Sequence, residues 1–169
     1  MQIFLSTITE IDYAGIREVI QDAYDDEGSV SDRIERLRKR PEYNYELEVV
    51  AKTDGYKLIG HVFLNEVTMT YEDETYYVLV LESLAVLKDY REQGIAQALL
   101  QAAEERARAA GYTTLITLDT PGFFEEMDYE PLEAYDIHFN EETRQKEARV
   151  KFLWEQLTER PHGVIASFE

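Results

Sequence analysis

Cysteine is absent from this sequence of 169 residues, and other residue types that signal specific functions are sparse. Without cysteine the chain forms no disulfide, no thiolate zinc site and no cysteine nucleophile. The three histidines, His61, His138 and His162, lack metal-ligand spacing, so we expect no metal. No apolar run approaches membrane-spanning length, and the N-terminus lacks the cationic start and apolar core of a signal peptide. We therefore expect a cytoplasmic protein with no membrane partner.

Basic residues are also few, because 17 Lys and Arg stand against 35 Asp and Glu, a formal net charge of −18. Affinity for nucleic acid comes from phosphate neutralisation by Lys and Arg, so this balance argues against a nucleic-acid partner. The same field would attract a basic amine substrate. Acidity that serves only solubility or a saline habitat is the simpler explanation.

The length and composition are those of one globular domain. At 44% hydrophobic and 31% charged residues, 169 residues bury one core and are too few for two comfortable domains. We predict a single domain spanning residues 1–169, as a monomer or homodimer.

The stretch from Val78 to Tyr112 is predicted to form the centre of the fold. Its first ten residues, 78–87, are apolar except for Glu82 and Ser83 and indicate a buried strand. A loop over residues 88–93 leads to Gly94, where an apolar stripe at helical spacing begins. Gly111 is expected to end that helix in a left-handed cap, and a strand follows over residues 113–118. This order predicts a right-handed βαβ unit with two parallel strands.

The turn before the helix has the composition of an anion-binding site. A helix that begins at Gly94 points its free N–H groups and the positive end of its dipole toward the loop. Gly94 admits a ligand close to the backbone, and Ala96 keeps the first turn small. The sequence has neither the glycine pattern of a Rossmann turn nor a P-loop lysine.

The segment Arg91-Glu92-Gln93-Gly94-Ile95-Ala96 resembles the Arg/Gln-x-x-Gly-x-Gly/Ala signature of the GNAT superfamily of N-acetyltransferases. LAVLKDYREQGIAQALL resembles the longer form of that signature. GYKLIGHVFLNEVTM is similar to the third-strand region of the branch named after the bacterial protein YhbS. The resemblance implies acetyl-CoA as co-substrate, with its pyrophosphate on the backbone of Arg91, Glu92, Gln93, Gly94, Ile95 and Ala96. Its pantetheine arm would run beside Leu84, Ala85 and Val86 like an added strand.

Two features of this segment concern charge. Coenzyme A is a polyanion, so its site must be locally basic, and Lys88 and Arg91 flank the turn. Glu92 departs from the pattern, because a glycine is frequent at that position in the superfamily.

The rest of the chain fits an α+β (mixed α/β) fold of GNAT type. Its central sheet is mostly antiparallel with one parallel βαβ unit, and helices cover both faces. We predict strands over residues 3–8, 47–52 and 57–71, helices over 10–24 and 32–40, with Ser31 as cap, and a last strand over 150–157. Thr120 and Pro121 are expected to start a short helix, and residues 141–147 to form a loop or short helix. The basic run from Arg36 to Arg40 is interpreted as a solvated face.

Glu82 is the candidate general base, because it is the only acid in an apolar strand and some GNAT enzymes place an acid there. A structural carboxylate, hydrogen-bonded at a β-bulge, explains it equally well. GNAT enzymes often carry a tyrosine on the short helix after the parallel strand, proposed to protonate the departing thiolate. The matching position is Phe124, which we expect to pack against the thioester end of acetyl-CoA.

The resulting functional prediction is transfer of an acetyl group from acetyl-CoA to a primary amine of a small molecule or peptide by direct attack. After the parallel strand, GNAT enzymes typically have Phe-Tyr-x-x-x-Gly-Phe, and Asp128 stands where that pattern has glycine. The departures at Glu92, Phe124 and Asp128 leave a second interpretation, a non-catalytic acyl-CoA-binding sensor or interaction module. A third is an acidic interaction protein without a small-molecule ligand.

Overall fold

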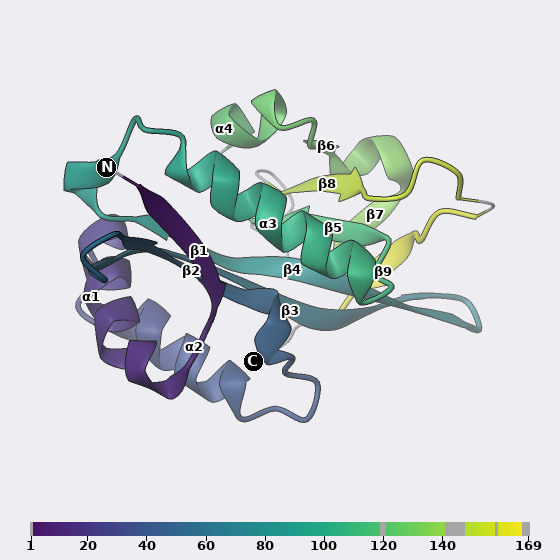
Figure 1. The fold of residues 1–169 in the computed structure, drawn as a ribbon. Coiled ribbons are helices and arrows are strands. Elements are labelled where there is room, and N and C mark those ends of the chain that lie inside the picture. The colour runs from purple at the N-terminus through teal and green to yellow at the C-terminus, as the bar shows by residue number, and fades with distance from the viewer. Residues whose placement is uncertain (1, 119–120, 141–147, 158, 167–169) are drawn as a thin grey trace. The chain divides into compact units, whose positions relative to one another are not determined.

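The computed structural model describes residues 2–118, 121–140, 148–157 and 159–166 (Figure 1). The chain divides into two compact units. The first unit consists of Met1–Asn65 and Glu82–Arg106, and the second of Glu66–Leu81 and Ala107–Glu169. Strands β3 (Leu58–Tyr71) and β4 (Glu74–Val86) and helix α3 (Ile95–Ala109) contribute a segment to each unit. Within the described residues no helix is both long and apolar enough to cross a membrane. The single domain over residues 1–169 stays a prediction.

The first unit is built on antiparallel strands. Strand β1 pairs with β2, and β2 pairs with β3, so that Leu5 lies opposite Ala51 and Ala51 opposite Gly60. The remaining elements of this unit are β1 (Ile3–Thr7), η1 (Glu10–Asp12), α1 (Tyr13–Tyr24), α2 (Ser29–Arg38), η2 (Tyr45–Leu47), β2 (Glu48–Thr53) and η3 (Lys88–Tyr90).

Helices cover both faces of the strands in the first unit, as predicted. Val50 packs with Ile16 and Ile34 in a core cluster that belongs to α1 and α2. The next residue of β2, Ala51, points to the opposite face because strand residues alternate. There a Cβ atom added to Gly60 would lie 2.9 Å from Leu99 Cδ1 of α3 and 3.2 Å from Ala51 Cβ. The missing side chain of Gly60 therefore allows α3 to pack closely on this face.

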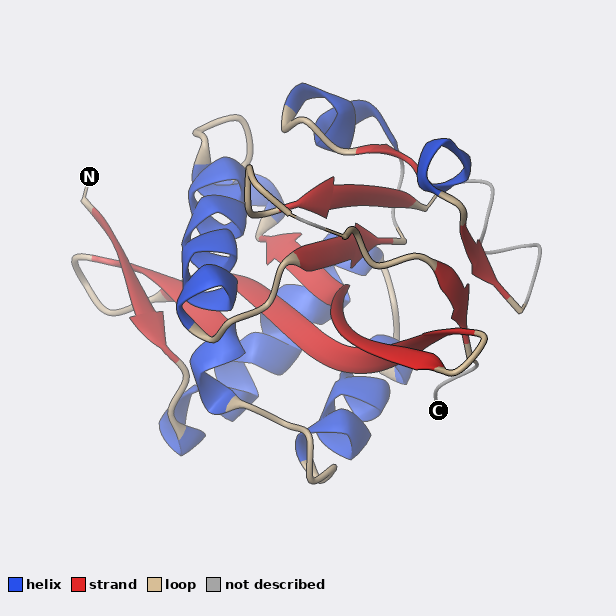
Figure 2. Ribbon diagram, turned by 90° about the vertical axis from the view of Figure 1, so that its right-hand side faces the viewer, coloured by secondary structure: helices blue, strands red, loops and turns tan. Residues whose placement is uncertain are grey.

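The second unit contains the predicted parallel pair. Strand β4 pairs in parallel with β5 (Thr114–Thr117), and the described register runs from Leu79↔Leu115 to Leu81↔Thr117. Strand β5 pairs antiparallel with β8 (Arg149–Phe152), which also pairs with β6 (Glu130–Pro131). Strand β9 (Gly163–Ile165) pairs antiparallel with β3 and parallel with β7 (Ile137–Phe139) (Figure 2). Helix α4 (Pro121–Glu126) and η4 (Leu132–Tyr135) complete this unit.

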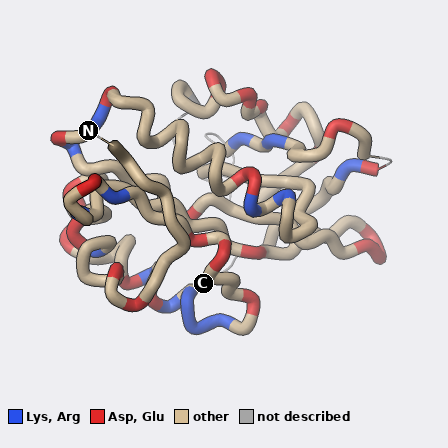
Figure 3. The backbone as a smooth tube through the Cα atoms, viewed as in Figure 1, with Lys and Arg blue, Asp and Glu red and all other residues tan. Residues whose placement is uncertain are grey.

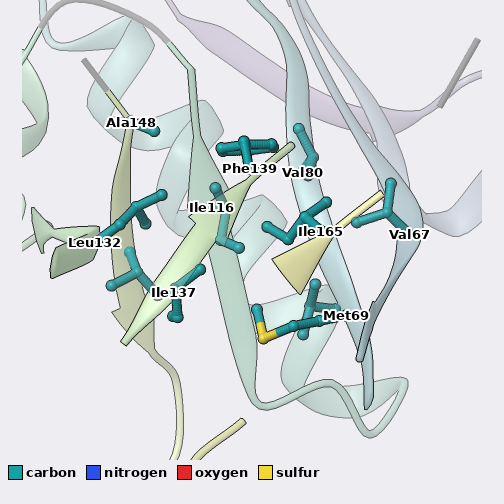
Figure 4. Close-up of a cluster of buried hydrophobic side chains, with 11 residues drawn as sticks. Val67, Met69, Val80, Ile116, Leu132, Ile137, Phe139, Ala148 and Ile165 are labelled. Carbon is teal, nitrogen blue, oxygen red and sulfur yellow. The ribbon is translucent and has the colours of Figure 1, made fainter. Parts of the chain in front are cut away.

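A buried apolar cluster forms the core of the second unit. Figure 4 shows Ile116, Val80 and Ile165 directed toward one another from β5, β4 and β9. All three side chains are buried, and Met69 of β3 and Ile137 of β7 join them. The short strands β7 and β9 thus supply core residues, which explains why they hold their places with so few ladder hydrogen bonds.

Several predicted boundaries were wrong. The last strand predicted over 150–157 is β8, which ends at Phe152, and β9 follows it. Strands β6 and β7 were not predicted, because two- and three-residue strands show no periodicity. Gly111 has φ +90°, which confirms the left-handed end of α3, and Pro121 begins α4 as expected. Thr120 and residues 141–147 lie outside the described residues.

The predicted Ser31 cap was also wrong. Helix α2 begins at Ser29, and Asp26 performs the capping role: its carboxylate accepts hydrogen bonds from Val30 N at 2.7 Å and Ser29 Oγ at 2.8 Å. Ser31 is buried inside the first turn, where its Oγ has no hydrogen-bond partner among the described residues. The helix predicted over residues 10–24 begins later than expected, because Glu10–Asp12 forms a 3₁₀ helix and α1 starts at Tyr13.

The basic run at the end of α2 is only partly a solvated face. Arg36 and Lys39 are exposed, as predicted. Arg38 instead donates from Nη2 and Nε to the carboxylate of Glu48, at 2.6 and 3.1 Å, and Arg40 donates to Asn65 Oδ1 at 2.8 Å. The interpretation was wrong for these two residues because their partners are distant in sequence.

Glu48 is a fully buried carboxylate surrounded by donors. Besides Arg38, it accepts hydrogen bonds from His61 Nε2 at 2.7 Å and from the hydroxyl of Tyr43 at 2.8 Å. Because a carboxylate only accepts, His61 carries a proton on Nε2, and its Nδ1 lies 2.9 Å from Ser83 Oγ. Burial alone would raise the pKa of Glu48, but the hydrogen bonds from His61 and Arg38 outweigh burial and lower the pKa to about 2.

This network predicts a specific loss of stability in Glu48→Gln. Removing the charge leaves Arg38 without its buried counter-ion, so we expect the free energy of unfolding at pH 7 to fall by about 3–5 kcal/mol. A depressed pKa contributes stability that is present above the ordinary value of 4.5 and is lost as pH falls toward 2. The variant should therefore lose less stability than the native protein between about pH 5 and about pH 2.

Urea unfolding at several pH values measures both effects. Glu46→Gln is the matched control, because Glu46 is exposed and lies two residues away. A Glu48→Gln variant within about 1 kcal/mol of the native protein would contradict this account of the network.

Candidate functional site

The turn from Arg91 to Gly94 connects η3 with helix α3 and is exposed. Two of its residues have left-handed backbone, Glu92 with φ 64° and Gly94 with φ 77°. Gly94 stands directly before the right-handed helix α3, and a left-handed residue beside a right-handed one turns successive N–H groups to the same side, as in an anion-binding concavity. The 15 residues of α3 follow directly and add the positive end of their dipole.

Open space lies in front of Gly94. Among the described residues, and leaving aside its chain neighbours, a Cβ atom added there would meet one atom within 4 Å, Gln97 Oε1 at 3.9 Å. The next residue, Ile95, is buried and anchors the start of the helix, whereas Gln93 is exposed and Ala96 half-buried. The backbone here can therefore be approached by a ligand, and a phosphate group fits the donors that it presents.

The two cations expected to make this turn basic are both held by the end of α1. Lys88 Nζ forms an ion pair with Asp25, and Arg91 Nη2 donates to the carbonyl oxygen of Ala23 at 3.1 Å. The carboxylate of Asp25 offsets the charge of Lys88, so the turn is less basic than its sequence indicates. Along the whole chain, acidic positions are widely distributed among the basic ones (Figure 3).

The three residues predicted to lie beside the pantetheine arm are the last of β4. Ala85 and Val86 are buried, and Leu84 is half-buried. The backbone of Leu84 bonds to a side chain: its N–H donates to the hydroxyl of Tyr24 at 2.9 Å, and that hydroxyl donates to its carbonyl at 3.2 Å. Sequence reasoning did not find Tyr24, because 60 residues separate it from Leu84.

Glu82 precedes this segment and lies in a polar cluster of the first unit. Its side chain is 4% exposed and accepts hydrogen bonds from Arg33 Nε at 3.0 Å, Arg33 Nη2 at 3.5 Å and Asn65 Nδ2 at 3.2 Å. A carboxylate has about four acceptor positions, so these contacts leave capacity for about one water. The geometry is compatible with a base that acts through water, and equally with a structural ion pair.

Phe124 lies in the second unit, in helix α4. It is 3% exposed and packs edge-on against Phe123 and Tyr129, with ring centroids 5.1 and 5.5 Å apart. Its contact with the thioester end of acetyl-CoA stays a prediction. Among the residues that the structure describes, no group of three or more His, Cys, Asp or Glu side chains could hold a metal ion.

Residues 14–129 match the Acetyltransferase (GNAT) family, which is more than half of the chain. The chain belongs to the GNAT family. This confirms the sequence resemblance and the predicted enzyme class of acyl-CoA-dependent N-acyltransferases. No curated protein sequence matches the chain significantly.

Solved GNAT structures have the same fold. The GNAT family N-acetyltransferase YhbS from Escherichia coli, solved in complex with CoA, is 21% identical with a TM-score of 0.87, covering 99% of this chain and 91% of its own. A GNAT family acetyltransferase from Brucella melitensis, in complex with acetyl-CoA, is 17% identical with a TM-score of 0.74. The match covers 99% of this chain and 96% of that one. A probable N-acyltransferase from Enterococcus faecalis V583 is 13% identical with a TM-score of 0.66, and the match covers 78% of this chain and 33% of that one.

Glu92 has a backbone that favours glycine, as the sequence resemblance suggested. Its φ of 64° is one that glycine adopts without a steric cost. A glutamate or alanine there carries a penalty of about 1 kcal/mol.

We therefore predict that Glu92→Gly is more stable than Glu92→Ala by about 1 kcal/mol, although alanine usually stabilises a chain relative to glycine. Urea unfolding of both variants provides the measurement. If the alanine variant is at least as stable, Glu92 does not have a left-handed backbone in solution.

Proposed function

We propose that the protein transfers the acetyl group of acetyl-CoA to a primary amine of a small molecule or peptide. The observation that carries this proposal is the Arg91–Ala96 turn, with two left-handed residues and open space at the start of α3. Family membership and the CoA and acetyl-CoA complexes of similar structures support it. Acetyl-CoA is a cytoplasmic metabolite, so the proposal includes a cytoplasmic location.

In this proposal, residues of the first unit hold the co-substrate. The backbone N–H groups of residues 91–96 would hold the pyrophosphate, helped by the dipole of α3. The edge of β4 at Leu84, Ala85 and Val86 would bind the amides of the pantetheine arm as a neighbouring strand does. Acetyl-CoA, when bound, supplies the acetyl group as an activated thioester. No metal enters the proposal.

The protein must also provide a neutral amine. An alkyl ammonium has an ordinary pKa near 10.4, so removing its proton at pH 7 costs about 5 kcal/mol. We assign this proton to Glu82, through a water in its remaining acceptor position. A nearby negative charge would stabilise the protonated form of the amine. Arg33 offsets the charge of Glu82 and so weakens this effect. The overall charge of −18 would attract basic acceptors.

Gly94→Glu tests the pyrophosphate site. A side chain and a negative charge would occupy the space in front of the turn, so we expect acetyl-CoA binding to be lost in a folded protein. Gly111→Glu is the matched control, because Gly111 also has positive φ, at 90°, and an added Cβ would meet no atom within 4 Å among the described residues beyond its chain neighbours. It introduces the same charge and backbone strain at the other end of α3.

Calorimetry with acetyl-CoA compares the two variants. Similar affinity in Gly94→Glu, Gly111→Glu and the native protein would refute the site.

Glu82→Gln tests the base. Loss of a general base should lower turnover by about two to four powers of ten at pH 7 while acetyl-CoA affinity is retained. The loss should shrink as pH rises, because more of the amine is then neutral.

The ion pair with Arg33 calls for a second variant, Glu82→Gln with Arg33→Gln, which also removes the cation that Glu82 balances. If Glu82 is the base, the double variant regains stability but no activity. Recovery of turnover in the double variant would show that Glu82 only balances Arg33.

Release of free thiol from acetyl-CoA with a panel of amines decides between catalysis and binding alone. Turnover with any amine supports the transferase. Binding without thiol release for every amine in the panel would favour the acyl-CoA-binding module, in keeping with the missing hydroxyl at Phe124.

A further inference from the structure

The last turn of helix α1 contacts the segment assigned to the co-substrate through consecutive residues. Asp22 Oδ2 accepts a hydrogen bond from the backbone N–H of Lys88 at 2.8 Å. The carbonyl of Ala23 accepts from Arg91 at 3.1 Å, and Asp25 forms an ion pair with Lys88. This turn therefore occupies both cations that flank the pyrophosphate site.

Tyr24 stands in the middle of this turn and reaches the edge of β4. Its hydroxyl accepts from the N–H of Leu84 at 2.9 Å and donates to the carbonyl of the same residue at 3.2 Å. One hydroxyl thus bonds both backbone groups, as a residue of a neighbouring strand would. The described pairing of β4 with β5 ends at Leu81, so Leu84 has Tyr24 as partner in place of that strand.

We propose that Tyr24 is a placeholder for acyl-CoA: its hydroxyl occupies the backbone groups of Leu84 that bind the pantetheine arm of the co-substrate, and it leaves them when the co-substrate binds. This inference rests on the proposed function. A backbone N–H carries one proton, so the N–H of Leu84 cannot form a full hydrogen bond with the tyrosine and with a carbonyl of the arm together. Binding of acyl-CoA therefore requires the hydroxyl to withdraw.

The contacts of the residues on either side of Tyr24 connect its withdrawal to the pyrophosphate site. Ala23 and Asp25 hold Arg91 and Lys88, and they adjoin Tyr24 on the same turn. Movement of that turn away from β4 releases both cations toward the pyrophosphate. Intact acyl-CoA then contacts both places, Leu84 with its arm and the turn with its pyrophosphate. Its nucleotide half alone contacts only the turn.

Tyr24→Phe tests the placeholder directly. The ring of Tyr24 packs against the core cluster of α1 and α2 and is retained, so we expect a folded protein. Without the hydroxyl, the free protein loses two hydrogen bonds that the complex lacks anyway, and acetyl-CoA should bind about tenfold more tightly. The affinity for 3′-phospho-ADP, which has no arm to reach Leu84, should rise less, because it gains only from the release of Arg91 and Lys88.

Tyr43→Phe is the matched control. Tyr43 packs against the same cluster, but its hydroxyl bonds to Glu48 and not to β4. Its acetyl-CoA affinity should equal that of the native protein. Calorimetry on the three proteins, after thermal melts that establish folding, gives the affinities.

The outcomes separate this inference from the proposed function. If the native protein and Tyr24→Phe bind acetyl-CoA equally, the placeholder is refuted while the proposed function stands. If Tyr24→Phe binds no tighter and turns over more than tenfold slower, the hydroxyl acts in the reaction and the placeholder is again refuted. If none of the three proteins binds acetyl-CoA, the proposed function fails and this inference fails with it.

Discussion

The buried carboxylate of Glu48 determines much of the first unit. A charge removed from water is tolerated only when donors surround it, and here Arg38, His61 and Tyr43 provide them from α2, β3 and the intervening loop. Ser83 extends the same network to β4. The position of helix α2 therefore depends on the ion pair between Arg38 and Glu48 as well as on the packing of its apolar side. The position of Arg33 beside Glu82 follows, because both arginines belong to this one helix.

The sequence predicts the elements whose signals are local. The apolar stripe of α3, the left-handed Gly111 and the parallel strand after it depend on residues within a few positions of one another. The GNAT signature has the same property, because the turn and the helix that bind an anion are contiguous. Local signals therefore predict the βαβ unit and the position of the turn, and the GNAT resemblance predicts the type of fold.

The sequence does not predict contacts between distant residues. The charge run at the end of α2 gives no sign that Arg38 faces a buried acid and Arg36 faces water, because helix geometry alone does not identify the partner. Tyr24 was assigned only to the end of a helix, and its bond to Leu84 depends on how α1 meets β4. Glu82 was recognised as unusual, but the arginine that accompanies it was not. Side-chain chemistry at a site depends on such pairings, which local periodicity does not specify.

The ion pair between Lys88 and Asp25 has a consequence for ionic strength. A polyanion that approaches a protein of charge −18 is repelled at long range, and the cation beside the turn is already compensated. Dissolved salt screens that repulsion over a Debye length of about 10 Å at 0.1 M. Association with an anionic co-substrate should then become faster as salt is added, the reverse of the steering that basic sites provide.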